Sequence, residues 1–400
     1  MLRYGVFVVI AGGLVLAFTF GSRQSFGMYL EPISTSMGWS VAVVSLALAI
    51  QSIFWGLGQP FFGWIADRFG TGRTLVLGSA IYVAGLFYAS RMQTPEDAYL
   101  SLGLLVGLGA AGCGMPIVMT AVVRAFPKER HPLVMALTAT GVSLGQFFVT
   151  PSARPIIDAF GWRNGLLCLM GLIGIVVLLA VVLRSRPVSR LRALEAEQSL
   201  REALIEARGH SGYLLLTAGF FVCGFHVQFI VTHLPNFISQ SGLPADVGGW
   251  AIATIGICNL MGTIAVGFLG SRYRKKYLLS GVYAVRALMF AVYAFTPVTT
   301  TTTLIFAAGL GLAWLSTVPL TSAIIGQIFG TRYFGTLFGI VFLGHQAGAF
   351  LGASLGGYLF DLTGSYDTIW FINIGLGVFA AIIHLPIADK PIERPLAQPA

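Results

Sequence analysis

Apolar runs of about 20 residues recur along the whole chain, and they limit its possible folds more than any other feature. A helix of that length spans the hydrocarbon core of a bilayer. Segments inside hydrocarbon must satisfy their own backbone groups, which leaves helices or closed barrels. The short alternating segments of a barrel do not occur in the sequence. Only 10% of the residues are charged, against about 25% in soluble domains. The sequence therefore predicts an all-α integral membrane protein.

Twelve transmembrane helices are expected. They cover residues 4–33, 40–64, 73–91, 97–124, 131–159, 163–184, 211–238, 246–270, 276–296, 302–329, 332–360 and 366–387. One long polar segment separates the sixth helix from the seventh. We therefore expect an N-terminal six-helix half at 1–183, a linker at 184–210, a C-terminal half at 211–390 and a tail at 391–400.

The two halves repeat each other at an offset of 203 residues. The identical pairs at this offset are Gly21/Gly224, Phe26/Phe229, Pro32/Pro235, Pro116/Pro319, Phe126/Phe329, Gly141/Gly344, Gly145/Gly348, Phe147/Phe350, Asp158/Asp361 and Gly161/Gly364. Six is an even number, so both halves start on the same side of the membrane and the repeat is parallel. Two repeated halves with a site between them are typical of secondary transporters.

Basic residues predict the orientation. Of the 24 Lys and Arg residues, 19 lie in loops or termini on one side of the predicted topology and two on the other. Cytoplasmic loops are the ones enriched in these residues. Both termini are therefore expected in the cytoplasm, with the protein in a plasma membrane such as the bacterial inner membrane. The net charge of +9 is then a topology signal and does not indicate a nucleic-acid partner.

The loop after the second predicted helix reads GWIADRFGTGRT, residues 63–74. It resembles the signature loop of the major facilitator superfamily, which has two parallel six-helix halves and no enzymatic activity. The resemblance implies a cytoplasmic latch between helices, formed by Gly63, Asp67, Arg68, Gly70 and Arg73. We expect Gly63 to allow close helix approach. The second copy, GFLGSRYRKKYL, has lost the acid, since Ser271 precedes Arg272, so its latch is expected to be weaker.

Two further stretches, FGMYLEPISTSMGWS (26–40) and LGGYLFDLTGSYD (355–367), resemble the monocarboxylate transporter and oxalate–formate antiporter branch. This resemblance implies transport of small carboxylates, with protons or in exchange. At the usual place of the branch's acid–arginine pair this chain has Asn259 and Thr263. Either another residue binds the anion, or the substrate is not a simple monocarboxylate.

Polar residues within membrane spans usually face the bundle interior or a substrate path. The candidates for substrate contact are Arg23, His226, Arg286, Asn259, His345, Gln51 and Trp314. Arg23 and His226 are related by the 203-residue offset, and we expect them to face each other across a central cavity. Two alternatives stay open. Arg23 could extend to the lipid headgroups, and Arg286 could bond backbone carbonyls or Tyr283.

These features predict a secondary active transporter of a small organic anion that works by alternating access as a monomer, with proton coupling or exchange. No cofactor or metal is expected. An exporter of an amphipathic drug-like or metabolite substrate is the alternative, although two motifs of proton-driven drug exporters are missing. An intramembrane serine protease is a remote alternative because Gly141–Gly145 reads G-x-S-x-G. A nucleophile elbow needs a strand-to-helix turn, and the repeat, GHQAG at 344–348, lacks the serine.

Overall fold

The computed structural model describes residues 2–127, 130–184, 199–330 and 333–392. Most of the predicted linker and tail thus lies outside the described residues. The N-terminal half contains α1 (Leu2–Ser25), the 3₁₀ segment η1 (Phe26–Tyr29), α2 (Leu30–Met37), α3 (Val41–Phe69), α4 (Thr71–Ala89), α5 (Pro95–Ala98), the π-helical η2 (Tyr99–Leu105), α6 (Val106–Gly112), α7 (Met115–Arg124) and α8 (His131–Val182). The end of the predicted linker forms α9 (Leu200–Gly209). The C-terminal half contains α10 (Ser211–Gln240), α11 (Asp246–Arg272), α12 (Lys275–Ala294), α13 (Thr300–Leu312), α14 (Thr317–Phe329), α15 (Phe334–Thr363) and α16 (Asp367–Ile383).

The predicted twelve crossings follow from these elements. Within the described residues, ten spans are long and apolar enough to cross a membrane. One of them includes α8, which turns at Gly161 (φ 77°, ψ 159°) and therefore makes two crossings. The twelfth is α16, a shorter apolar helix of 17 residues, which is within the range of about 17–25 that can span a bilayer.

The repeat predicted from the sequence recurs in the backbone. Gly161 and Gly364, which are 203 residues apart, both have positive φ angles, 77° and 69°. A left-handed backbone is favourable for glycine because it has no Cβ. Each of these glycines turns the chain from the fifth helix of its half into the sixth. The two halves therefore use a glycine with positive φ at the same point of the repeat.

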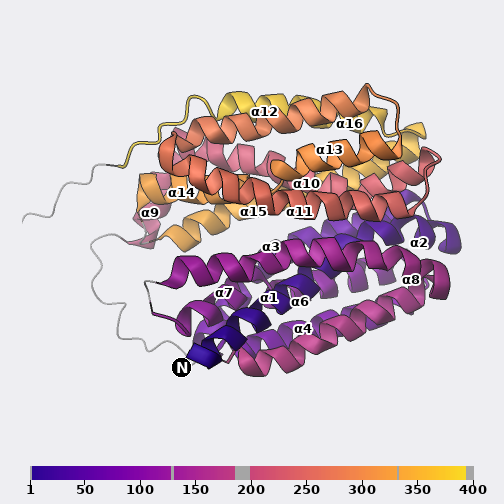
Figure 1. Ribbon diagram of the computed structural model, residues 1–400, viewed down its shortest axis with the longest axis horizontal. Helices are drawn as coiled ribbons and strands as arrows, with labels where there is room; N and C mark the ends of the chain where they lie inside the picture. The colour runs from indigo at the N-terminus through magenta and orange to yellow at the C-terminus, as the bar shows by residue number, and fades with distance from the viewer. Residues whose placement is uncertain (1, 128–129, 185–198, 331–332, 393–400) are drawn as a thin grey trace, which may run out of the picture.

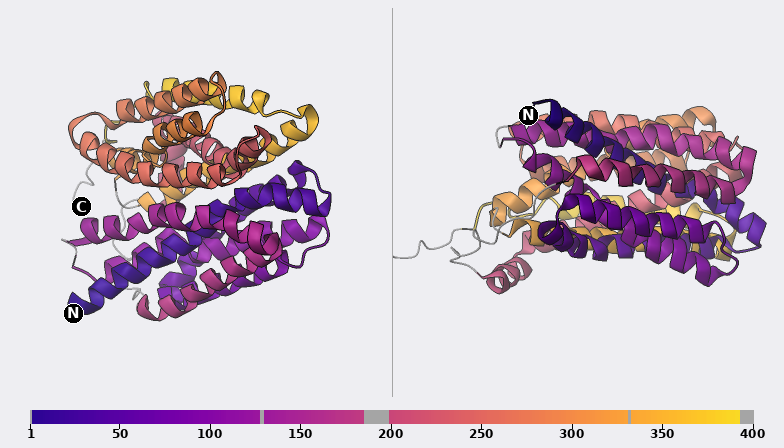
Figure 2. Two further views of the ribbon diagram at one scale, coloured as in Figure 1. Left: turned by 45° about the vertical axis from the view of Figure 1, so that its right-hand side comes forward. Right: turned by 90° about the horizontal axis from the view of Figure 1, so that it is seen from below.

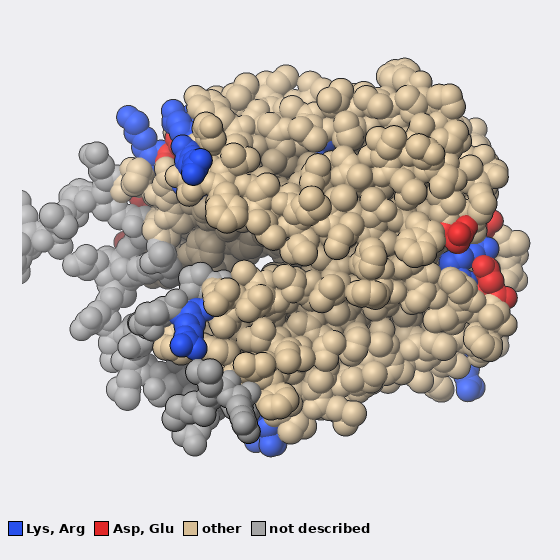
Figure 3. All heavy atoms as spheres, viewed as in Figure 1, with Lys and Arg blue, Asp and Glu red and all other residues tan. Residues whose placement is uncertain are grey.

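The halves lie side by side, with the N-terminal half in indigo to magenta and the C-terminal half in rose to yellow (Figures 1 and 2). Figure 3 shows a hollow between them at the end of the bundle where the N-terminus lies, whereas they touch toward the opposite end. On this face the charged side chains gather at the two ends, and the belt between them is almost uncharged. An uncharged belt of this kind is suited to contact with the hydrocarbon core of a bilayer.

Close backbone approaches bring the halves together away from the hollow. A Cβ at Gly27 in η1 would collide with the carbonyl oxygen of Val231 in α10. A second close contact between the halves joins α15 and α3, where a Cβ at Gly357 would collide with the hydroxyl of Ser45. Glycine is the residue that allows backbones to approach this closely.

Asp361, at the end of α15, closes the same end of the bundle by capping a helix of the other half. Its carboxylate accepts hydrogen bonds from the backbone N–H of Val41 (3.1 Å) and of Ala42 (2.8 Å), at the start of α3. The first N–H groups of a helix lack intrahelical partners and carry partial positive charge. Nearby, Ser239 donates to Glu31 across the halves at 2.9 Å.

We expect Asp361→Asn to favour conformations in which this end is open, because the amide keeps an acceptor but loses the charge. The shift should be about 0.5–1 kcal/mol, measured as a longer distance between spin labels on the start of α3 and the end of α15. Asp158→Asn is the matched control, since Asp158 pairs with Arg154 on its own helix (2.9 Å). Equal distance distributions in all three proteins would contradict the assignment.

Asp389 fastens the segment after α16 to the C-terminal half. Its Oδ1 lies 2.5 Å from Nη2 of Arg274, before α12, and its carbonyl accepts from Gln327 of α14 at 2.6 Å. The hydrogen bond from Arg274 holds the pKa of the Asp389 carboxyl below its usual value. A carboxyl with a lowered folded-state pKa stabilises the fold above its unfolded pKa and loses that effect as the pH falls.

Asp389→Asn should therefore lower the thermal unfolding temperature at pH 7 by a small amount. The difference from the parent protein should begin to shrink as the pH drops below about 4, where Asp389 of the unfolded parent becomes protonated, and it should vanish as the pH falls through the lowered folded-state pKa. Thermal unfolding in detergent across pH 3–8 measures this, within the pH range where the parent stays folded. A difference that is constant over the whole range would show that charge plays no part.

Candidate functional site

Glycine packing between α1 and α8 positions the site. A Cβ at Gly141 would collide with the carbonyl oxygen of Gly13, and one at Gly145 with that of Ala17. In the repeat, a Cβ at Gly348 would collide with the carbonyl oxygen of Phe221. The G-x-S-x-G stretch is therefore a helix-packing motif within α8. No strand-to-helix turn presents its serine.

Arg23 lies buried between the two halves with 7% of its surface exposed. Its Nη2 donates to Oε1 of Gln228 in the other half (2.7 Å) and to Oγ of Ser52 in α3 (3.2 Å). The guanidinium carbon is 4.3 Å from the centre of the Trp55 ring, a distance suited to a cation–π contact. The side chain thus bridges the halves in this conformation and is not extended to the membrane surface.

Further polar contacts cross between the halves. Nδ2 of Asn259 in α11 lies 3.4 Å from Oγ of Ser143 in α8. Gln346 of α15 packs on Gly56 of α3, where a Cβ would come within 2.7 Å of the Gln346 side chain. The 203-residue offset relates Gly56 to Asn259 and Ser143 to Gln346, so the two contacts are equivalent under the repeat. We use the name polar layer for Arg23, Ser52, Ser143, Gln146, Gln228, Asn259 and Gln346.

An aromatic wall borders Arg23. Trp55 lies edge-on to Phe20 (5.7 Å between ring centres) and to Phe342 of the other half (5.5 Å). Phe342 stacks on His345 at 5.4 Å. A small cavity of about 10 Å³ lies between Arg23, Trp55 and three neighbours. The site therefore combines one cation, neutral amides and an apolar surface.

The prediction that His226 faces Arg23 is wrong in this conformation. His226 is buried within the C-terminal half, where Nε2 lies 3.0 Å from the carbonyl oxygen of Asn373 and the ring contacts Phe290 at 4.8 Å. The residue that reaches Arg23 is Gln228. Residues i and i+2 of an α-helix point about 200° apart, so the side chains of His226 and Gln228 leave α10 in nearly opposite directions.

Arg286 hydrogen-bonds the backbone where the chain passes from α13 to α14. Its Nε donates to the carbonyl oxygen of Ala313 (3.0 Å), and its Nη2 donates to that of Trp314. Carbonyls at a helix end lack intrahelical hydrogen-bond donors, and here the guanidinium of Arg286 is the donor. Asn259 also bonds the backbone between α13 and α14, since its Oδ1 accepts from the N–H of Leu315 at 3.0 Å. Of the two readings open for Arg286, these contacts match the structural one.

Two other candidates are held by local contacts. Gln51 is buried in the N-terminal half and donates from Nε2 to the carbonyl oxygen of Leu102 in η2 at 3.0 Å. His345 lies beside Gln346, with Nδ1 3.3 Å from its Oε1, and it contacts the aromatic wall. His345 is therefore next to the polar layer, and Gln51 is directed away from it.

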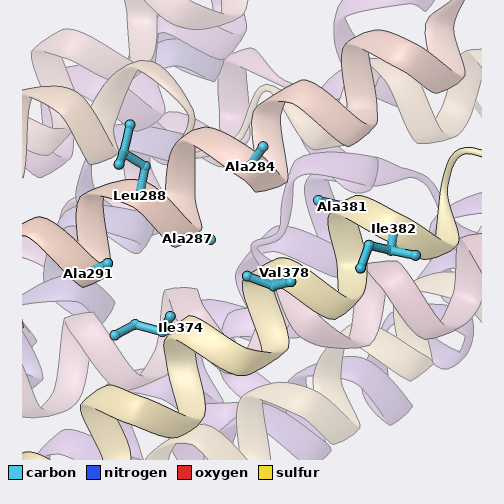
Figure 4. A pocket seen from close by; sticks show the side chains of 8 residues that line it. All are labelled: Ala284, Ala287, Leu288, Ala291, Ile374, Val378, Ala381 and Ile382. Atoms are coloured by element: carbon cyan, nitrogen blue, oxygen red, sulfur yellow. The ribbon is translucent and has the colours of Figure 1, made fainter.

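A larger cavity lies elsewhere. About 350 Å³ opens between α12 and α16, lined by Ala284, Ala287, Leu288, Ala291, Ile374, Val378, Ala381 and Ile382 (Figure 4). All of these side chains are apolar, so nothing there would orient a polar ligand. Within the described residues, no group of three or more His, Cys, Asp and Glu residues could hold a metal ion.

The profile of the Major Facilitator Superfamily matches residues 12–317 and 216–400. The chain belongs to the major facilitator superfamily. Monocarboxylate transporter 13 of Rattus norvegicus is 25% identical over 95% of this chain and 89% of its own length. The oxalate:formate antiporter of Oxalobacter formigenes is 24% identical over 97% and 93%.

Solved structures agree on the fold of this superfamily member. The nucleoside transporter NupG superposes with a TM-score of 0.75 at 16% identity, over 96% of this chain and 98% of that one. A D-xylose-proton symporter gives 0.76 at 13% identity, over 98% and 100%. The protein is thus a multi-pass membrane transporter of this superfamily and not an enzyme, and the protease alternative is excluded.

The stretch that resembles the superfamily's signature loop forms the end of α3, Gly70 and the start of α4. Gly70 ends that helix with φ 91°, a backbone angle that requires glycine. The guanidinium of Arg68 lies 5.6 Å from the ring of Trp64, and Arg73 is exposed. The expected close approach at Gly63 is wrong in this conformation, since a Cβ there would have no neighbour within 4 Å. The side chain of Asp67 lies outside the described structure.

Sequence reasoning names Gln346 beside His345 as a further cavity candidate and considers Ser143 only for the protease alternative. It misses Ser52, Gln146 and Gln228 of the polar layer. A polar residue in an apolar span is itself a signal of function, and both glutamines carry it. Gln228 was overlooked because its neighbour His226 matched the repeat. Gln146 directly follows Gly145 of the G-x-S-x-G motif, which directed the interpretation to the serine.

Proposed function

We propose that this protein is a secondary active transporter of a small organic anion, a monocarboxylate or a related carboxylate, which works by alternating access. The observation that carries the proposal is Arg23, a cation buried where the two halves meet and bound to both of them. A charge within a membrane span is costly and usually functional. Its present partners are uncharged, so an anion would be a better partner than either.

The surroundings of Arg23 suit a small anion with an apolar part. A carboxylate could take the place of Gln228 and Ser52 at the guanidinium, while Trp55 and Phe342 would pack on the carbon skeleton. The names of the relatives, a monocarboxylate transporter and an oxalate:formate antiporter, support the same substrate class. Coupling to protons or exchange of one anion for another would both fit this arrangement.

The orientation belongs to the proposal. We place the N-terminus, the linker and the C-terminal tail in the cytoplasm, with the protein acting as a monomer in the bacterial inner membrane. The hollow between the halves would then open inward (Figure 3). The excess of basic residues on that side supports the placement.

Transport by purified protein in liposomes tests the function. Uptake and counterflow would be measured across a panel of carboxylates, with and without a pH gradient. We expect saturable counterflow of at least one monocarboxylate. If no carboxylate is transported while an amphipathic cation is expelled, the drug exporter is the correct alternative.

The latch formed by Gly63, Asp67, Arg68, Gly70 and Arg73 is also a proposal. We expect Asp67→Asn to shift the balance between inward-open and outward-open states and to lower turnover without loss of folded protein. Distances between labels on the ends of α3 and α15 at the N-terminal end of the bundle measure the balance. Unchanged populations together with normal turnover would show that the loop is not a latch.

A further inference from the structure

Several buried polar atoms without partners lie in the polar layer and beside Arg23 in the sequence. Among the described residues, fourteen buried side-chain nitrogen and oxygen atoms have no hydrogen-bond partner. Four of them belong to the polar layer, namely Nε of Arg23, both amide atoms of Gln146 and Nε2 of Gln346, and Ser22 and Gln24 flank Arg23 with one each. Most buried polar groups in folded proteins are paired. The polar layer therefore has free donors and acceptors that a polar ligand could use.

Gln146 is the most complete of these exceptions. Its side chain is 0% exposed, and neither Nε2 nor Oε1 has a partner in the described structure. A buried amide that loses its hydrogen bonds is destabilising, so leucine would suit this position better if packing were its purpose. The amide is therefore suited to a group that it meets at another stage of transport.

The position of Gln146 connects it to Arg23. It directly follows Gly145, where α8 packs on α1, the helix that carries Arg23. Across the halves it faces Gly256 of α11, where a Cβ would come within 2.9 Å of the glutamine side chain. The hydrogen bond between Asn259 and Ser143, one turn away, already joins α8 and α11. Gln146 is thus not needed to hold the halves together, and movement of the halves would uncover it.

We infer that Gln146 determines substrate specificity by hydrogen-bonding an uncharged polar group of the anion whose carboxylate binds Arg23. This inference rests on the proposed function. An amide offers one donor group and one acceptor without charge, which matches a hydroxyl or a carbonyl. A second carboxylate would need a second cation for favourable burial, and within the described part of the polar layer the cation is Arg23. The substrate class is therefore a monoanion with an additional neutral hydrogen-bonding group.

Affinity measurements with matched acids test the inference. The probes are pentanoate, its 2-, 3- and 4-hydroxy derivatives, and pentanedioate, titrated by calorimetry into the purified protein. We expect at least one hydroxy acid to bind about three- to tenfold more tightly than pentanoate, as one net hydrogen bond allows, and pentanedioate to bind more weakly than pentanoate. Gln146→Leu should remove the preference for the hydroxy acid while the affinity for pentanoate changes less than twofold.

Controls separate this role from a structural one. Gln240→Leu, an exposed glutamine at the end of α10, should leave every affinity unchanged. An equal loss of affinity for pentanoate and for the hydroxy acid in Gln146→Leu would overturn the inference. A wild-type protein that does not bind a hydroxy acid more tightly than pentanoate would overturn it as well. In either case carboxylate binding through Arg23 would still support the proposed function. If wild-type protein binds none of the acids, the proposed function fails as well.

Discussion

Arg23→Gln is expected to lower the affinity for the transported carboxylate about 10- to 100-fold. A hydrogen bond to a charged group contributes about 1.5–3 kcal/mol, and glutamine cannot supply the charge. The variant should still fold and insert, because Arg23 now bonds only neutral partners, Gln228 and Ser52, to which an amide can also hydrogen-bond. Calorimetric titration of the purified variant measures the affinity, and size-exclusion chromatography reports on folding.

Two comparisons make the result specific. Arg23→Lys should retain part of the affinity, since lysine keeps the charge but lacks the planar fork of arginine. Arg154→Gln should retain all of it, because Arg154 pairs with Asp158 and Glu31 near the far end of the bundle. A wild-type affinity in Arg23→Gln would show that this arginine only joins the halves, and the site assignment would be wrong.

Arg286→Met is expected to have the opposite profile, with a large loss of stability and little change in substrate affinity. The substitution leaves the carbonyl oxygens of Ala313 and Trp314 without their donor. Each unsatisfied buried group costs about 1–3 kcal/mol, so the free energy of unfolding should fall by about 2–5 kcal/mol. Thermal unfolding in detergent measures the loss.

The conservative change separates charge from geometry at this position. Arg286→Lys should recover part of the stability, since a lysine can donate to one of the two carbonyls but does not reproduce the fork. If Arg286→Met unfolds at the parent's temperature but no longer binds carboxylates, Arg286 would be the main anion contact instead of Arg23. The two arginines are thus distinguished by stability and affinity in the same pair of proteins.

The sequence by itself determined the architecture. Twelve crossings followed from the length of the apolar runs, since backbone groups in hydrocarbon must bond within a helix. The parallel repeat followed from a constant 203-residue offset, and the turns at Gly161 and Gly364 confirm it in the backbone. These features are local or periodic, so they can be read without knowing which helices touch. The same reasoning correctly assigned Gly141 and Gly145 to packing and not to catalysis.

Only the tertiary structure decided which polar side chains meet. Arg23 and His226 occupy equivalent places in the repeat, yet one bonds across the halves and the other bonds Asn373 within its own half. The repeat fixes the position of a Cα atom, whereas the length of the side chain and the neighbouring helices fix its partners. Gln228 reaches Arg23 from α10, a helix of the other half. Contacts of this kind depend on how two helix bundles face each other, which no spacing along one chain encodes.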